Sequence, residues 1–242
     1  FTVTIDDCEP PSIACPDDVV VGNDAGSCDA IVNYALPTGA DNSGSVTVSQ
    51  TGGLASGSVF PLGTSTVTYQ AADPSGNTAE CSFTVTVNDD EPPVALAKDI
   101  TVQLDATGNT SITAADVDNG SSDNCGIASL SVAPNSFDCS NVGANTVTLT
   151  VTDNNGNTST TTATVTVEDN VAPVALAQDI TVQLDVAGNV SIAASQIDNG
   201  SNDACGIASL SVVPGSFDCS NVGANTVTLT VTDNNGNVST AT

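Results

Sequence analysis

Carboxylates at recurring positions are the side chains of this sequence best suited to chemistry. Each of three successive segments carries an Asp in a loop, an Asp in a later hairpin turn, and a group of acids at a junction. Oxygen ligands at this density suit Ca²⁺, which accepts about six to eight oxygens in flexible geometry. The alternative is that Asp stands there because turns favour it. The candidate calcium ligands are Asp6, Asp7, Glu9, Asp41, Asp73, Asp89, Asp90, Glu91, Asp123, Asp153, Glu168, Asp169, Asp203 and Asp233.

Eight cysteines form a second set of chemically active side chains. Their number indicates an oxidising compartment, where disulfides form and persist. Cys125 and Cys139 are the only cysteines of the second segment, and Cys205 and Cys219 are the only ones of the third. This distribution predicts one disulfide inside each of these two segments, each closing a loop of about 15 residues.

The first segment holds four cysteines, which allow three connectivities. Cys15 begins its first predicted strand and Cys81 begins its last. Both are expected at the end of the domain where the chain enters, which favours a bond between Cys15 and Cys81. Cys8 and Cys28 have no assigned partner, so an intersubunit bond and free thiols both stay open.

Catalysis is not expected from these residue types. A serine nucleophile has no supporting base, because the sequence contains no His and Lys98 is its only basic residue. Paired carboxylates could serve a glycosidase, but an aromatic content of 3% supplies almost no sugar platforms. Neither a CxxC motif nor His supports a zinc site. We therefore predict a protein without enzymatic activity.

The overall charge excludes two classes of partner. Acidic residues number 28 against one basic residue, which makes the formal charge −27. Such a surface does not attract nucleic acid or an anionic membrane. No run of residues has the length of a membrane helix, and no signal peptide is recognisable. Because the sequence does not begin with Met, we expect it to be an internal piece of a processed or longer protein.

The chain is organised by repetition. Residues 136–157 return unchanged as residues 216–237, an offset of 80, and a looser copy of residues 143–157 stands at 63–77. A period of about 80 residues is too long for a solenoid unit and suits a small sandwich domain. The expected organisation is a last strand of a preceding repeat, or a donated strand, at 1–8, followed by repeats at 9–90, 91–170 and 171–242.

Alternation of Val, Ile and Leu with Thr predicts short, half-buried antiparallel strands. No helical period is present, so each repeat is expected to form a two-sheet β-sandwich in an all-β protein. The DNNGN segment predicts a hairpin turn between the last two strands. In the second repeat, the expected strands are 100–104, 111–117, 128–132, 146–152 and 162–167.

The first seven residues predict association between copies of the chain. They match the last strands at 83–89 and 163–169, whereas the third repeat stops before its own last strand. Phe1, Val3 and Ile5 lie on one face of this segment and are the expected contacts. Either covalent tandem repetition or donation of this strand to a neighbour explains the pattern. Both explanations predict a head-to-tail filament of the chain with itself.

The first repeat resembles the hyalin repeat (HYR) module across its length, from IACPDDVVVGNDAGSCDAIV to AECSFTVTVND. Ser43 stands where that family often has the cysteine of a DNC motif. The second and third repeats lack the CP and CSF cysteines, and they resemble the degenerate HYR-like arrays of large secreted adhesins of gliding and related bacteria. The resemblance implies tandem immunoglobulin-like β-sandwich domains with roles in adhesion or extracellular scaffolding.

An immunoglobulin-like sandwich places its B–C and F–G loops at one end, so the acidic elements are expected to converge at each junction, where Ca²⁺ would stiffen the array. The leading expectation is a structural unit of an extracellular bacterial filament or adhesin stalk. The alternative is a ligand-binding adhesin module for polysaccharide or a surface. Ice binding through flat Thr arrays is disfavoured, because sandwiches twist.

Overall fold

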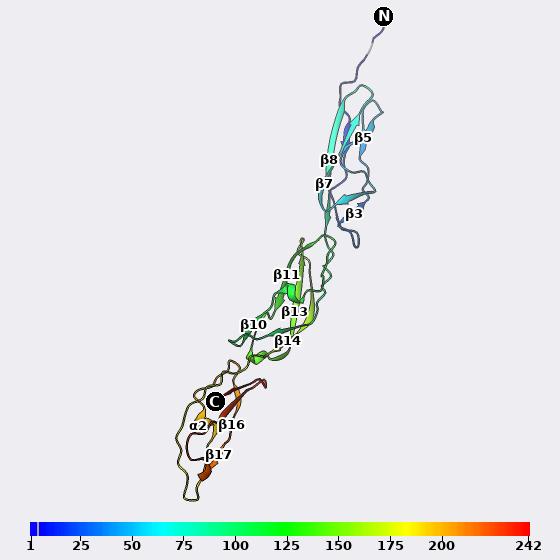
Figure 1. Cartoon of the computed structure of the whole chain (residues 1–242). Helices are drawn as coiled ribbons and strands as arrows, with labels where there is room; N and C mark the ends of the chain where they lie inside the picture. Colours follow the sequence, from blue (N-terminus) through cyan, green and yellow to red (C-terminus); the bar gives the residue numbers. More distant parts are fainter. Residues whose placement is uncertain (4) are drawn as a thin grey trace. The chain divides into compact units, whose positions relative to one another are not determined.

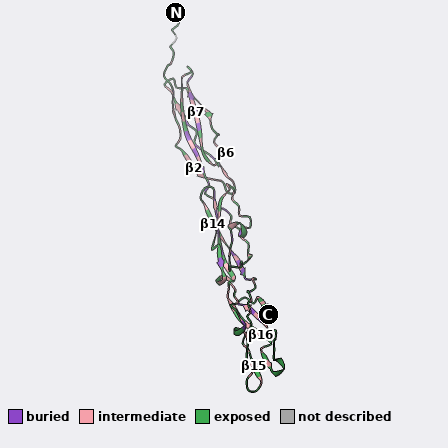
Figure 2. Cartoon of the chain, turned by 60° about the vertical axis from the view of Figure 1, so that its left-hand side comes forward, coloured by how far each residue is buried: buried purple, intermediate pink, exposed green. Residues whose placement is uncertain are grey.

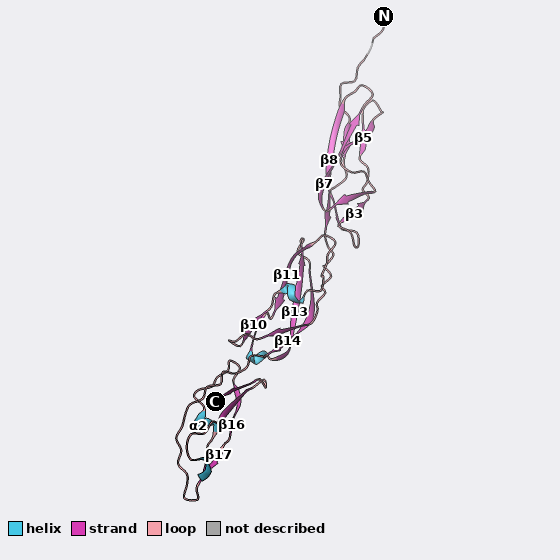
Figure 3. Cartoon of the chain, viewed as in Figure 1, coloured by secondary structure: helices cyan, strands magenta, loops and turns pink. Residues whose placement is uncertain are grey.

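The computed structural model describes residues 1–3 and 5–242, and β-strands dominate its regular structure (Figure 3). The predicted all-β class with sandwich domains is confirmed. The chain forms two compact units, of which the first comprises Phe1–Ala95, Gly120–Leu130 and Thr150–Thr160. The second comprises Leu96–Asn119, Ser131–Leu149 and Thr161–Thr242. The division falls inside the second predicted repeat, so the boundaries of the three repeats stay predictions.

The first repeat is built from three sheets (Figure 1). The largest has the strand order β2-β8-β7-β5, and β3-β6 and β1-β4 are two-stranded. Alternate residues of a strand face the same side of a sheet, so Val67 of β7 and Phe83 of β8 are buried together with Phe60. Figure 2 shows buried stretches of β7 in purple. The strands are β1 Ser12–Ala14, β2 Val19–Gly22, β3 Asp29–Val32, β4 Thr38–Ala40, β5 Thr47–Gly52, β6 Ser58–Pro61, β7 Gly63–Ala72 and β8 Thr78–Asn88.

The last strand of this repeat, β8, occupies a slot between two neighbours. It pairs in parallel with β2, where Val85 faces Val19, and antiparallel with β7, where Val87 faces Gly63. Asp18, just before β2, adds a contact, because its Oδ1 accepts the backbone N–H of Thr84 at 2.6 Å. The last strand therefore lies inside the sheet, between β2 and β7.

The second repeat uses its last strand in the same way. Its main sheet has the order β11-β13-β14-β9, and Val165 of β14 faces Ile100 of β9 in a parallel pair. Asp99 Oδ1 accepts the backbone N–H of Thr164 at 2.7 Å. The elements are β9 Ile100–Gln103, β10 Asn109–Ser111, α1 Ala114–Val117, β11 Ile127–Ala133, β12 Ser136–Asp138, η1 Cys139–Asn141, β13 Gly143–Asp153 and β14 Thr158–Glu168.

The predicted strand at 111–117 is wrong over most of its length, because α1 is a helical turn. Asp116 Oδ2 accepts the backbone N–H and the hydroxyl of Thr113, each at 2.7 Å. This local hydrogen bonding resembles a capping box and competes with a strand ladder.

The third repeat has a smaller main sheet, with the order β16-β18-β19. Residues 180–183, which correspond to β9, form no strand in the described chain. The elements of this repeat are β15 Asn189–Ser191, α2 Ala194–Ile197, β16 Ile207–Val213, β17 Ser216–Asp218, η2 Cys219–Asn221, β18 Thr228–Asp233 and β19 Val238–Ala241.

Identical sequences adopt different structures in the second and third repeats. Residues 136–157 and 216–237 are the same, yet β13 has 11 residues and β18 has 6. The pairing of β18 with β19 ends where Leu229 faces Ala241. Residues 223–227 therefore have no ladder partner in the described part of the chain, and without one the backbone does not form a strand.

The residues expected to mediate polymer contacts are exposed. Phe1, Val3 and Ile5 have relative exposures of 132%, 84% and 90%. Within residues 1–3 and 5–8, no strand forms. These side chains are available to a partner that provides a sheet edge.

Candidate functional site

Three disulfides are present, and two of them join different predicted repeats. Cys15 is bonded to Cys81, the pairing that the sequence favours. The predicted bonds of Cys125 with Cys139 and of Cys205 with Cys219 are wrong. Cys28 is bonded to Cys125 and Cys139 to Cys205, with Cα–Cα distances of 5.0 Å and 5.2 Å, while Cys8 and Cys219 are free and exposed.

The length of β13 explains why Cys125 and Cys139 do not pair. Cys139 stands before β13, and its sulfur lies 3.7 Å from the carbonyl oxygen of Gly108. Cys125 contacts the turn after β13, where its carbonyl accepts the side-chain amide of Asn154 at 2.9 Å. The 11 residues of β13 span roughly 35 Å, at about 3.3 Å per residue. Bonded cysteines need Cα atoms within about 7 Å.

The structure brings predicted calcium ligands together at the first junction. Carboxylate oxygens of Asp7, Asp41 and Asp73 lie within 4.8 Å of one another. Burial raises the pKa of Asp73, but hydrogen bonds from Asn77 and from backbone N–H groups of its turn outweigh this and lower the pKa overall. Asp73 thus has a structural role in the turn, as the alternative reading of these acids proposes.

The second junction contains Asp89, Asp123 and Cys125, whose potential ligand atoms lie within 4.8 Å of one another. Asp89 is 5% exposed, and its Oδ2 is buried without a hydrogen-bond partner. Burial raises the pKa of Asp89, and the charges of Asp123, Asp153 and Glu91 raise it further. An uncompensated buried carboxylate is costly and therefore calls for an explanation.

The same arrangement recurs in the second unit. Asp169, Asp203 and Cys205 have potential ligand atoms within 4.8 Å of one another. Asp169 is 6% exposed and also has a buried Oδ2 without a partner. In both clusters the sulfur belongs to a disulfide, so only the carboxylates are free to act as anionic ligands.

Other predicted ligands have partners within the protein. Glu9 Oε2 accepts the amide of Asn42, and Glu91 Oε2 accepts that of Asn124. Glu168 Oε2 accepts a hydrogen bond from the side-chain amide of Gln103.

Asp153 and Asp233 stabilise the hairpin turns by accepting hydrogen bonds at both carboxylate oxygens. Asp6 and Asp90 belong to none of the three clusters.

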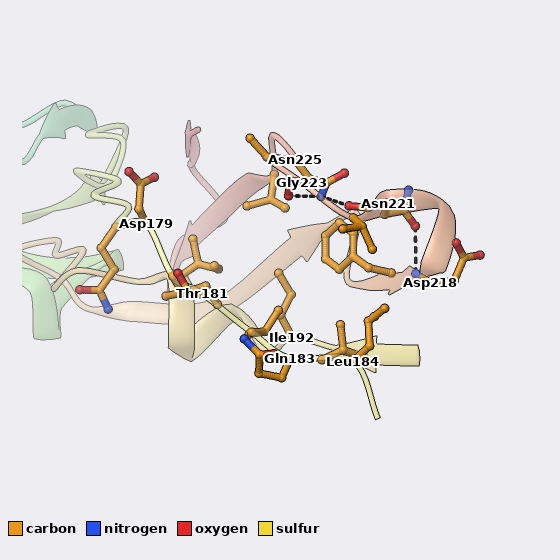
Figure 4. Close-up of a pocket in the computed structure, with 18 residues that line it drawn as sticks. Asp179, Thr181, Gln183, Leu184, Ile192, Asp218, Asn221, Gly223 and Asn225 are labelled. Atoms are coloured by element: carbon orange, nitrogen blue, oxygen red, sulfur yellow. Dashed lines mark hydrogen bonds between the residues drawn. The ribbon is translucent and has the colours of Figure 1, made fainter. Parts of the chain in front are cut away.

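A groove in the third repeat is the second candidate site. Its volume is about 720 Å³. Figure 4 shows Thr181 and Gln183 on one side of the groove and Gly223 and Asn225 on the other. Its apolar lining comes from Ile180, Val182, Leu184, Val190, Ile192, Ile197, Phe217, Val222, Ala224 and Val227.

The groove corresponds in sequence to the slot that β14 fills in the second repeat. Shifting by 80 residues maps β9 onto 180–183, and the start of β13 onto 223–227. Phe137 and Val147 are buried, at 4% and 0% exposure, but their counterparts Phe217 and Val227 are only half-buried. The groove therefore exposes the core residues that a last strand covers elsewhere.

Sequence reasoning predicted that the third repeat lacks its last strand, but it missed Asp179, a polar residue of the groove. The available signal was the 80-residue offset, which places Asp179 where Asp99 accepts the N–H of Thr164. Asp179 lines the groove. It is thus placed to accept the same N–H from a strand entering the slot.

Residues 6–87 match the family model described as the HYR domain, and this part of the chain is an HYR domain. Hyalin of Strongylocentrotus purpuratus is 48% identical over 99 residues, which cover 38% of this chain and 8% of that protein. Hyalin of Lytechinus variegatus is 35% identical over 136 residues, which cover 53% of this chain and 25% of that protein. The chain thus spans a quarter or less of these relatives.

A further relative is rat "Sushi, von Willebrand factor type A, EGF and pentraxin domain-containing protein 1", 39% identical over 94 residues that cover 38% of this chain and 3% of that protein. Among solved structures, human CDH23 EC21-23 matches with a TM-score of 0.41 and 15% identity, covering 96% of this chain and 99% of that one. In the described residues, no helix is long and apolar enough to cross a membrane.

Proposed function

We propose that the chain is an extracellular structural module of the adhesion type, and that copies associate head to tail by strand donation. The observation that carries the proposal is the groove between residues 180–183 and 223–227. Its occupant is residues 1–7 of a second copy, because this segment has the alternating pattern of the two last strands that fill the corresponding slots. The three disulfides favour an oxidising, extracellular setting.

The pairing in the first two repeats defines the register of the donated strand. Val85 and Val165 face Val19 and Ile100 in the parallel pairs. By the repeat offsets, Val3 corresponds to Val85 and Val165, and Ile180 corresponds to Ile100. Val3 of the donor therefore faces Ile180 of the acceptor.

The same offsets align the rest of the donated strand. Ile5 faces Val182 on one side and Gly223 on the other, as Val87 faces Gly63 in the first repeat. Thr2 corresponds to Thr84 and donates its backbone N–H to Asp179. Backbone hydrogen bonds supply the affinity of such an added strand, and its apolar side chains supply the specificity.

The two free cysteines support the head-to-tail order. Cys219 follows β17 as Cys139 follows β12, and Cys139 is bonded to the next repeat. In the second repeat, Cys125 forms the disulfide to the preceding repeat, and its backbone N–H donates to Asp123. Ser43 occupies the equivalent position in the first repeat, where its backbone N–H donates to Asp41. Cys8 adjoins Glu9, which binds Asn42 of that same loop. In the proposed assembly, Cys219 of one copy and Cys8 of the next become neighbours.

The assembly is tested with the full chain, a chain lacking residues 1–7, and the synthetic peptide FTVTIDD. Light scattering is expected to find oligomers of the full chain and monomers of the shortened chain. The peptide should bind the shortened chain, and a peptide with Val3→Asp and Ile5→Asp should not. A monomeric full chain that binds neither peptide would contradict strand donation.

Covalent tandem repetition, the alternative to strand donation, predicts a different chain mass. If the native polypeptide continues into a further repeat, its own next strand fills the groove. Denaturing mass measurement on reduced native material would then find a chain much heavier than 23.9 kDa. The bacterial origin of the module, and polysaccharide or another surface as its partner, stay predictions.

A further inference from the structure

Two buried carboxylate oxygens have no partner inside the protein. Among the described residues, only Asp89 Oδ2 and Asp169 Oδ2 are buried side-chain polar atoms without a hydrogen bond. They occupy equivalent positions, 80 residues apart. Their recurrence in both units indicates a shared requirement of the two junctions.

The other oxygen of each carboxylate is already engaged. Asp89 Oδ1 accepts the backbone N–H of Glu91 at 3.2 Å, and Asp169 Oδ1 accepts that of Val171 at 3.1 Å. These bonds orient each carboxylate and leave Oδ2 as the coordinating atom.

A second carboxylate lies beside each one. A carboxylate oxygen of Asp123 lies within 4.8 Å of one of Asp89, and a carboxylate oxygen of Asp203 lies within 4.8 Å of one of Asp169. Asp123 Oδ1 accepts the N–H of Cys125 at 2.8 Å, and Asp203 Oδ1 accepts that of Cys205 at 2.7 Å. Two anionic groups so close together repel one another unless a cation lies between them.

The protein has almost no basic side chains that could neutralise these carboxylates. Lys98 is the only basic residue in the sequence, and its charge acts on Asp116. Because the nearby sulfurs are bonded in disulfides, the available ligands are hard oxygens, which prefer Ca²⁺ or Mg²⁺ to soft metals.

We propose that Asp89 with Asp123, and Asp169 with Asp203, each bind one Ca²⁺ ion. Water and backbone carbonyls complete the coordination, which in Ca²⁺ sites is flexible enough to accept an irregular ligand set. The cluster of Asp7, Asp41 and Asp73 is outside the proposal, because both oxygens of Asp73 are engaged in its turn.

Each proposed ion ties a junction to the repeat that follows it. Asp89 follows β8, the last strand of the first repeat, and Asp123 belongs to the loop that carries Cys125. The ion and the Cys28–Cys125 disulfide therefore restrain the same loop, one ionically and one covalently. Removing Ca²⁺ would loosen this loop without breaking the covalent link.

Titration calorimetry on the full chain, freed of divalent cations, tests the proposal. We expect two Ca²⁺ sites per chain. Asp89→Asn and Asp169→Asn should each remove one site, and Asp90→Asn, an exposed neighbour outside the clusters, should remove none. Undiminished Ca²⁺ binding by the double variant would overturn the assignment.

Thermal unfolding provides a second test, because the Asp89→Asn substitution and the addition of Ca²⁺ have separate expected effects on the Tm. Without Ca²⁺, Asp89→Asn should raise the Tm, because it removes an unpaired buried charge. With Ca²⁺, the wild-type chain should gain stability, since binding favours the folded state, and the variant should gain less. If the variants do not fold, the Tm of the wild-type chain decides the question. A Tm that does not rise when CaCl₂ is added, or that rises more with MgCl₂ than with CaCl₂, would overturn the proposal.

Discussion

Cys28 is bonded to Cys125 across 97 positions of sequence, with Cα atoms 5.0 Å apart, and the bond joins the first predicted repeat to the second. Cys205, which stands 80 residues after Cys125, is bonded to Cys139, so a second disulfide joins the second predicted repeat to the third. Two disulfides therefore restrain the junctions between successive predicted repeats.

The disulfide pattern predicts the outcome of peptide mapping. Alkylation of the denatured, unreduced monomer should label Cys8 and Cys219, and digestion should release peptides linking Cys28 to Cys125. Serine at both Cys28 and Cys125 should lower the free energy of unfolding of the first unit by about 4.7 kcal/mol in the chain-entropy model. Serine at both Cys8 and Cys219 is the matched control and should leave stability unchanged. Peptides linking Cys125 to Cys139 would contradict the structure.

Charged substitutions in the groove should impair strand donation. Val182→Asp and Val227→Asp each place a carboxylate in its apolar lining. We expect each to weaken binding of the FTVTIDD peptide about tenfold or more, equivalent to at least about 1.4 kcal/mol. Val186→Asp is the control, because Val186 is fully exposed outside the groove. Fluorescence anisotropy of a labelled peptide provides the measurement, and equal affinities for all three variants would exclude the groove as the binding site.

Acid should destabilise the turns that contain Asp105, Asp138 and Asp218. Hydrogen bonds from Thr107 lower the pKa of Asp105, and those from Ser140 and Ser220 lower the pKa values of Asp138 and Asp218. A lowered folded-state pKa contributes stability above the unfolded-state value of about 3.9, and this contribution disappears as pH falls through the folded-state pKa.

Thermal melts in chelator between pH 6 and pH 2 check this direction. The decline of Tm below about pH 4 should be shallower in Asp138→Asn than in wild type, while Asp90→Asn serves as the control for surface charge. A wild-type Tm that rises on acidification over this range would contradict the prediction.

The HYR domain should depend strongly on Phe60. This residue is fully buried against Tyr34, with ring centroids 6.3 Å apart. Phe60→Ala should lower the free energy of unfolding by roughly 3–5 kcal/mol, as large cavities do. Its neighbour Val59 is 51% exposed, so Val59→Ala is the matched control and should have a much smaller effect. Urea denaturation distinguishes the two variants, and equal losses would contradict the proposed core.

Much of the architecture could be predicted from residue patterns. Alternation around Val147 and Val165 identified strands that the structure contains, because a half-buried strand needs period-two hydrophobicity. Asp89 and Asp123 converge as expected, whereas Asp153 of the hairpin turn is not part of their cluster. Their role as calcium ligands stays a prediction. The pairings predicted within the second and third repeats failed, because counting cysteines within a repeat ignores the length of β13, which separates Cys139 from Cys125.

The sequence by itself determined the repeat period, the all-β class and which residues have apolar faces, since these depend on local spacing. The tertiary structure alone decided the partners of Cys125, Cys139 and Cys205, and how far a strand extends. Residues 143–147 are strand, whereas the identical residues 223–227 are not. The physical reason is that a β-strand needs hydrogen bonds from its neighbours, and those neighbours lie elsewhere in the chain or in another copy.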